Sequence, residues 1–100
     1  MTTDLHRTVS SAVDSLREEM TALSRHLYLH PELSLAEHAS SVLLQDRLRL
    51  AGFSVTPGVA GLPTSFVATA RSARPGPRIA FLAEYDALPG IGHACGHNLI

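Results

Sequence analysis

Apolar residues recur at every third or fourth position in the first quarter of the chain. This stripe consists of Leu5, Val9, Val13, Leu16, Met20, Leu23 and Leu27. The spacing matches the repeat of an α-helix, so it places these side chains on one helical face. Pro31 follows the stripe, and the residue before a proline is disfavoured in the helical conformation. We therefore predict a helix over residues 5–27 that ends before Pro31.

A second helix is predicted to begin at Ser34 and to end near Ala51. Ser34 and Glu37 have the spacing of a capping box, in which each side chain accepts a hydrogen bond from the backbone N–H of the other. Gly52 suits the left-handed residue that follows a helix. A wide apolar surface is typical of a helix with more than one packing partner. Here it comprises Leu35, Ala39, Val42, Leu43, Leu44, Leu48, Leu50 and Ala51.

Short apolar stretches separated by turn residues follow Gly52. Residues 53–56 and 65–69 have the alternating pattern of strands, and residues 71–77 form a loop with two prolines and a glycine. Residues 78–83 are apolar on both faces, as in a central strand that is covered on both sides. This order predicts an α/β fold in which two N-terminal helices pack on a mixed sheet, with residues 78–83 as its most buried strand.

Length and composition exclude several classes of protein. One hundred residues, 45% of them hydrophobic and 17% charged, suffice for one small domain or part of a larger one. The apolar content excludes a disordered tail, and no apolar run is long enough for a membrane span. A single cysteine excludes a disulfide scaffold, and a net charge of −1 offers no basic field to nucleic acid. Without the apolar core of a signal peptide, we expect a cytoplasmic protein with neither nucleic-acid nor membrane partners.

Candidate chemistry gathers after the third predicted strand. Glu84 and Asp86 follow that strand, and their two-residue spacing points both side chains to one side of an extended segment. His93, Cys95 and His97 alternate with small residues, and thiolate and imidazole are zinc ligands. The simpler interpretation is a free cysteine beside solvated carboxylates and two surface histidines. A closed four-ligand site is not expected with one cysteine, so the pattern favours a partial metal site.

Four sequence blocks in this order resemble the N-terminal part of the M20 metallopeptidase family. They are residues 30–37 (HPELSLAE), 61–68 (GLPTSFVA), 83–89 (AEYDALP) and 92–97 (GHACGH). The run AEYDALPGIGHACGHNLI is most similar to the amidohydrolase branch, and within it to aminobenzoyl-glutamate hydrolases and M20-domain dipeptidases. The resemblance covers nearly the whole chain after the first helix.

The resemblance implies a metal site and assigns residues to it. Cys95 and His97 correspond to metal ligands of this branch, and Asp86 corresponds to a catalytic-site residue that supports the metal ligands. Glu84 stands where the wider family has a histidine, and Glu84 and His93 are candidates for supporting positions. The implied cofactor is a divalent metal, Zn²⁺ with Mn²⁺ as the alternative, and the complete enzyme would hold two ions.

The resemblance also implies a fold and an activity. Residues 1–100 would form the N-terminal segment of a zinc-peptidase-like catalytic domain, without its lid and dimerisation domain. The reaction would be metal-assisted hydrolysis of an amide bond in N-acyl amino acids, aminobenzoyl-glutamate or dipeptides, by a homodimer. The family's catalytic glutamate lies downstream of the block that ends at His97, so we expect the 100-residue chain alone to be inactive. Many relatives have aspartate where this chain has Asn98.

Two alternatives stay open at this point. One is a truncated, non-catalytic fragment that binds metal weakly at most. The other is a helix-hairpin interaction module built from the two predicted helices. The reading frame after Ile100 distinguishes them from the enzyme, because a continuation with a Glu-Glu pair would supply the missing base.

Overall fold

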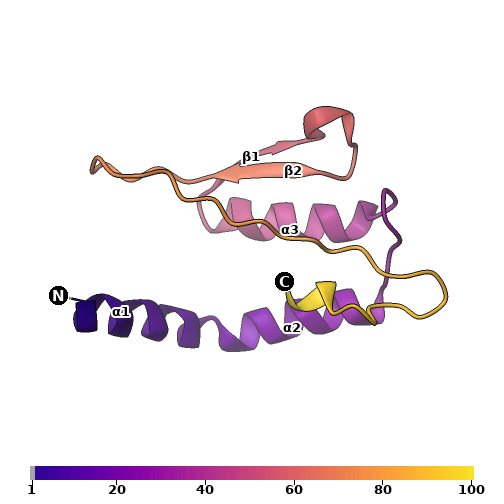
Figure 1. Cartoon of the computed structure of the whole chain (residues 1–100), viewed down its shortest axis with the longest axis horizontal. Coiled ribbons are helices and arrows are strands. Elements are labelled where there is room, and N and C mark those ends of the chain that lie inside the picture. The colour runs from indigo at the N-terminus through magenta and orange to yellow at the C-terminus, as the bar shows by residue number, and fades with distance from the viewer. Residues whose placement is uncertain (1) are drawn as a thin grey trace.

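The computed structural model describes residues 2–100 and combines helices with a small sheet (Figure 1). The helices are α1 (Thr2–Ser15), α2 (Arg17–Leu29) and α3 (His38–Leu50), the strands are β1 (Ser54–Pro57) and β2 (Phe66–Thr69), and the 3₁₀ turns are η1 (Val59–Gly61) and η2 (His97–Leu99). This mixture of helix and strand confirms the predicted α/β class.

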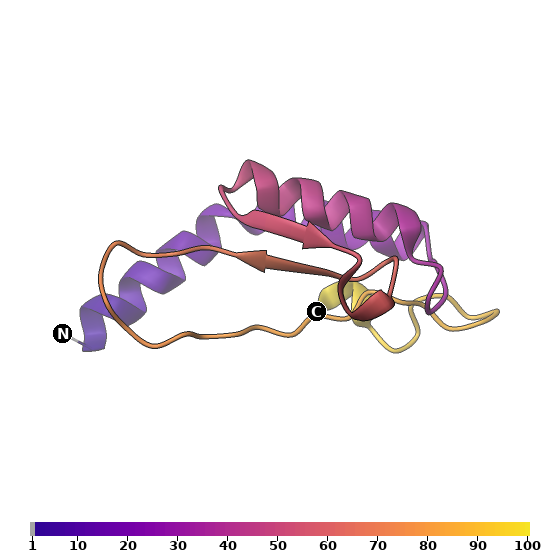
Figure 2. The same ribbon diagram turned by 90° about the horizontal axis from the view of Figure 1, so that it is seen from above.

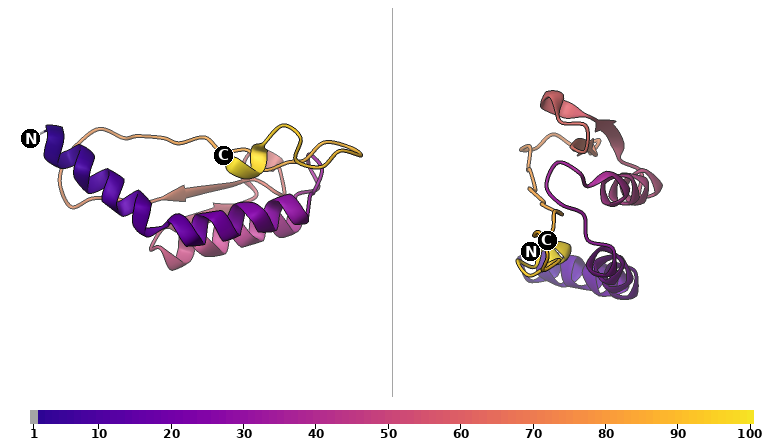
Figure 3. Two further views of the ribbon diagram at one scale, coloured as in Figure 1. Left: turned by 90° about the horizontal axis from the view of Figure 1, so that it is seen from below. Right: turned by 90° about the vertical axis from the view of Figure 1, so that its right-hand side faces the viewer.

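The first predicted helix is divided into two, α1 and α2, which meet at an angle (Figure 3, left). Leu16 lies between them and leaves the helical conformation, with φ −96° and ψ 1°. Just before it, the Ser15 hydroxyl donates a hydrogen bond to the Ala12 carbonyl at 2.6 Å. Such a side-chain bond competes with the backbone ladder and bends helices, so a continuous apolar stripe did not guarantee a continuous helix.

The predicted capping box at the start of α3 is wrong. The helix begins at His38, and Leu35 adopts a left-handed conformation with φ 67°, so Ser34 lies too far upstream to cap it. The Glu37 carboxylate does reach back along the chain, but it accepts the Leu35 N–H at 2.6 Å. Ser34 is therefore part of the loop that precedes α3.

Glu32 supplies the cap instead. Its two carboxylate oxygens accept the backbone N–H groups of Ser40 at 2.6 Å and Ala39 at 3.0 Å. Burial raises the pKa of Glu32, but hydrogen bonds from Ser40 and Ala39 outweigh it and hold this pKa below its ordinary value. A carboxylate at this helix end also interacts favourably with the helix dipole.

We expect Glu32→Ala to destabilise the protein by about 1 kcal/mol, the usual cost of losing a helix cap. Ser34→Ala is the matched control and should leave stability unchanged. Urea unfolding of the full translation product that contains these residues measures both. Since folding lowers the Glu32 pKa, the contribution should be present above the unfolded pKa and disappear as the pH falls through the folded value. An equal cost at Ser34 would contradict this assignment of the cap.

Strands β1 and β2 pair antiparallel, in a register that runs from Ser54 opposite Thr69 to Pro57 opposite Phe66. They confirm the strands expected at residues 53–56 and 65–69. Helix α3 packs directly against both strands, whereas α2 lies beyond α3 on the side away from the sheet (Figures 1 and 3). An ion pair between Arg47 and Glu19 links α3 to α2. The fold class is therefore as predicted, with one helix between the sheet and the other helices.

The prediction of a buried central strand at residues 78–83 is wrong for the described part of the chain. The segment is extended but forms no ladder, and it returns alongside the sheet as a bare trace (Figure 2). Ile79, Phe81 and Leu82 are 73%, 92% and 93% exposed. A strand needs hydrogen-bonding and packing partners, and residues 2–100 place none against this segment. Its apolar pattern alone could not create them.

Little apolar surface is buried elsewhere in residues 2–100. Leu27 and Ala87 are the buried hydrophobic residues there, while Val42 and Leu50 on α3 are exposed, which confirms the expectation of uncovered apolar surface. The radius of gyration is 15.3 Å, against about 13 Å for a compact domain of this length. None of the helices among these residues is both long and apolar enough to cross a membrane.

Candidate metal centre

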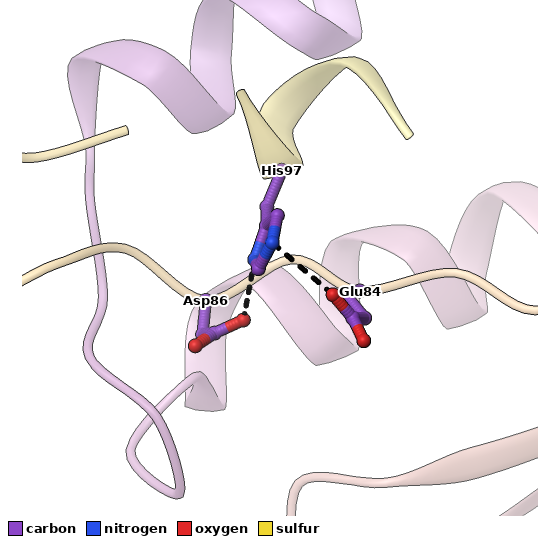
Figure 4. Close-up of side chains that lie close together, drawn as sticks. All are labelled: Glu84, Asp86 and His97. Carbon is purple, nitrogen blue, oxygen red and sulfur yellow. Dashed lines mark hydrogen bonds and ion pairs between the residues drawn. The ribbon is translucent and has the colours of Figure 1, made fainter. Parts of the chain in front are cut away.

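A sharp reversal of the chain brings the two predicted site segments together. After the extended segment that carries Asp86, the Leu88 N–H donates to the Gly92 carbonyl at 2.9 Å and closes a tight loop. Gly96 then adopts φ 80°, a left-handed conformation that suits glycine, and η2 begins at His97. The bend expected at Gly96 is therefore present, and it turns the His97 side chain toward Asp86 (Figure 4).

Asn98 holds the same turn against α2. Its amide nitrogen donates to the Ser24 hydroxyl at 3.2 Å and lies 3.4 Å from the Ser24 carbonyl oxygen. An aspartate at this position has no N–H to donate to that carbonyl. The asparagine that replaces the common aspartate thus has a positioning role next to His97.

Three side chains with ligand-type atoms converge at this turn. His97 Nδ1 lies 2.7 Å from Asp86 Oδ1, and His97 Nε2 lies 3.1 Å from Glu84 Oε2 (Figure 4). One candidate ligand atom from each of the three lies within 4.8 Å of the others. Glu84 is exposed, while Asp86 and His97 are half-buried, so the cluster opens to solvent on the side of Glu84.

The two carboxylates raise the pKa of His97. The hydrogen bond with Asp86 contributes most, partial desolvation opposes it, and the charges of Asp86 and Glu84 add to the increase. The imidazole therefore keeps its proton to a higher pH than a free histidine. In the neutral ring, the bond to Asp86 favours a proton on Nδ1 and leaves Nε2 as the atom that can bind a metal.

We expect Asp86→Asn to lower the pKa of His97 toward its ordinary value, and Glu84→Gln to lower it less, because Asp86 provides the stronger contact. Proton NMR titration of the His97 ring in the metal-free full translation product measures both. Since folding raises this pKa, the contact stabilises the fold below the unfolded pKa, and this stabilisation is lost as the pH rises through the folded pKa. A larger shift in Glu84→Gln than in Asp86→Asn would contradict this order.

The other two residues singled out by sequence lie differently. Cys95 is exposed and is not part of the Glu84, Asp86 and His97 cluster. His93 is only 6% exposed, and neither of its ring nitrogens has a hydrogen-bond partner in the described chain. A buried imidazole without partners is costly, so a polar group or ion from outside residues 2–100 would fit against it.

The cluster fits a divalent metal ion in its chemistry. Carboxylate oxygen and imidazole nitrogen suit Zn²⁺ and Mn²⁺. Three protein ligands leave coordination positions for water or substrate, as catalytic rather than structural sites do. The sequence had placed Glu84 only in a supporting position, although its two-residue spacing from Asp86 was the signal that both carboxylates face one side.

No family model matches the chain. Its relatives include the "Xaa-Arg dipeptidase" of Mus musculus, 41% identical over 96% of this chain and 24% of that protein. The human "Xaa-Arg dipeptidase" is 43% identical over 91% of this chain and 23% of that protein. A p-aminobenzoyl-glutamate hydrolase protein of Escherichia coli (strain K12) is 32% identical over 97% of this chain and 23% of that protein.

The chain spans about a quarter of the length of these relatives. The similarity covers nearly all of its own residues, including the blocks that carry Glu84, Asp86 and His97. Over these residues the chain therefore belongs to the M20 metallopeptidase family, within its branch of amidohydrolases and dipeptidases.

Proposed function

We propose that these residues are the N-terminal segment of the catalytic domain of a metal-dependent amidohydrolase. The observation that carries the proposal is the convergence of Glu84, Asp86 and His97 on one small volume. The names of the relatives support the reaction class, since they describe a dipeptidase and an aminobenzoyl-glutamate hydrolase. The proposed substrates are accordingly dipeptides, aminobenzoyl-glutamate and N-acyl amino acids.

Each residue of the cluster has a distinct part in the proposal. Asp86 accepts the Nδ1 proton of His97, which fixes the ring and leaves Nε2 for the metal. Glu84 provides a carboxylate on the other side of the ring. A bound divalent ion supplies Lewis acidity toward the amide carbonyl and lowers the pKa of water.

Cys95 and His93 enter the proposal in different ways. The resemblance makes Cys95 a metal ligand, and in the structure its thiol is exposed on the loop just before His97. We keep it as a thiolate donor that would join the three clustered side chains. His93, buried and without partners in the described residues, is proposed to support this loop. The cofactor proposed is Zn²⁺, with Mn²⁺ as the alternative and two ions in the complete enzyme.

The test is hydrolysis by the full translation product that contains these residues, after treatment with a chelator and readdition of Zn²⁺ or Mn²⁺. The substrates are Xaa-Arg dipeptides, p-aminobenzoyl-glutamate and N-acetyl amino acids. We expect hydrolysis that depends on the added metal. No hydrolysis of any substrate with either ion would overturn the proposal. Sedimentation and cell fractionation of the same product test the further expectations of a homodimer and of a cytoplasmic location.

A further inference from the structure

The block at residues 30–37 is part of the family resemblance but contributes no side chain to the metal cluster. It is nevertheless joined to the segment that carries the cluster. The Ala87 N–H donates to the Glu32 carbonyl at 2.7 Å, and Leu33 and Ala87 form an isolated parallel bridge. Because Glu32 also caps α3, the residue directly after Asp86 is attached to the fixed end of a helix.

A second connection runs through buried side chains. Glu37 is 7% exposed, and one of its oxygens accepts the Thr64 hydroxyl at 2.6 Å while the other accepts the Leu35 N–H at 2.6 Å. Thr64, 5% exposed, in turn accepts the Tyr85 hydroxyl at its backbone carbonyl. The Tyr85 ring also stacks on Phe66 of β2, with centroids 6.0 Å apart. Both oxygens of the buried Glu37 carboxylate are thus satisfied, and Tyr85 is held at its ring and at its hydroxyl.

Tyr85 lies between the two carboxylates of the metal cluster. Side chains alternate along an extended segment, so Glu84 and Asp86 point to one side and Tyr85 to the other. Both carboxylates contact His97 on their side. Holding Tyr85 on the opposite side therefore limits rotation of the segment and directs Glu84 and Asp86 at the histidine.

We propose that Glu37, Thr64 and Tyr85 form a positioning relay that aims Glu84 and Asp86 at His97. The relay rests on the proposed metal site, which it deepens by naming the residues that orient its carboxylates. It crosses three parts of the chain: the loop before α3, the loop between the strands, and the extended segment that carries the cluster. None of the three residues needs to touch metal or substrate.

The test uses Tyr85→Phe in the full translation product. Tyr85→Phe keeps the ring that stacks on Phe66 but removes the hydroxyl that bonds to Thr64. Thr64→Val removes the hydroxyl held by Glu37, and Thr64→Ser restores it. Ser65→Ala is the matched control, because the Ser65 hydroxyl bonds only within its own loop, to Val59 and Leu62 carbonyls.

Two measurements separate positioning from simple stability. In metal-free protein, NMR follows the Nδ1 proton of His97, which reports the bond to Asp86 directly. The second is titration with Co²⁺ as the probe, read from its visible absorption. We expect Tyr85→Phe to broaden or lose the Nδ1 signal and to raise the Co²⁺ dissociation constant about 10-fold, the lower end for a residue that supports a ligand. Thr64→Val should act in the same direction, with Thr64→Ser and Ser65→Ala resembling the unchanged protein.

The outcomes are distinct. An unchanged Nδ1 signal and Co²⁺ spectrum in Tyr85→Phe would overturn the relay, even if the variant were less stable. If the unchanged protein bound no Co²⁺, the proposed function would fail, while the metal-free Nδ1 signal would still decide the relay. If Thr64→Val did not fold because it leaves a Glu37 oxygen without its donor, Tyr85→Phe would decide alone.

Discussion

Replacing His97 with alanine should remove the metal-dependent amide hydrolysis of the full translation product. His97 is the one member of the cluster that contacts both carboxylates, at 2.7 Å and 3.1 Å. Losing a residue that only supports a ligand costs about 10- to 100-fold in metal affinity or activity. Losing the ligand itself should cost more, so we expect kcat/KM to fall by over about 100-fold. Steady-state kinetics and the metal content of the purified protein measure the effect.

Two further variants grade this result. Asp86→Asn keeps the shape of the side chain but weakens the bond to His97, and should lower kcat/KM by about 10- to 100-fold. His6→Ala is the matched control, because His6 is exposed on α1 far from the cluster in sequence and should have no effect. If His97→Ala kept both its metal and its turnover, the cluster would not be the catalytic metal site.

Local patterns predicted the elements better than their ends. The apolar stripe through Leu16 predicted helix correctly on both sides of that residue, but the break depends on one hydroxyl bond, from Ser15 to Ala12. Glu32 caps α3 from seven and eight residues upstream, because Leu35 turns left-handed and brings it back to the helix start. A sequence pattern that expects a cap within three residues of its partner cannot show such a turn.

Contacts between distant segments account for the remaining differences. Residues 78–83 have the composition of a central strand, yet the described chain offers no neighbouring strand or covering layer to bury Phe81 and Leu82. Composition describes what a segment can bury, while its partners decide whether it is buried.

The site shows the same division between local and distant information. The spacing of Glu84 and Asp86 and the position of His97 in its motif were enough to name these residues from sequence. Their mutual distances depend on the reversal between Leu88 and Gly92. Thr64 was not found, because its bonds to Glu37 and Tyr85 cross 27 and 21 residues and follow no sequence pattern.

The 100-residue polypeptide, expressed by itself, should show no amide hydrolysis above background, even with added Zn²⁺ or Mn²⁺. Its glutamates are already engaged or remote: Glu32 caps α3, Glu37 bonds to Thr64, and Glu18 and Glu19 lie on α2. Glu84 contacts His97 as part of the metal cluster, so it is not free to act as a separate general base. The lack of general acid–base help alone reduces a rate by about 10²- to 10⁴-fold.

Weak metal binding should accompany this lack of turnover. The clustered side chains are Glu84, Asp86 and His97, and Glu84 is exposed, so an ion bound there keeps much of its water and is readily lost to a chelator. The measurement is hydrolysis of dipeptides, aminobenzoyl-glutamate and N-acyl amino acids by the purified polypeptide, with Cys95→Ala beside it. Metal-dependent turnover that disappears in Cys95→Ala would show that these residues build a complete site on their own, with the exposed thiol drawn into it. Background rates in both proteins, together with metal-dependent turnover by the full translation product, would place the general base and the remaining ligands outside this segment.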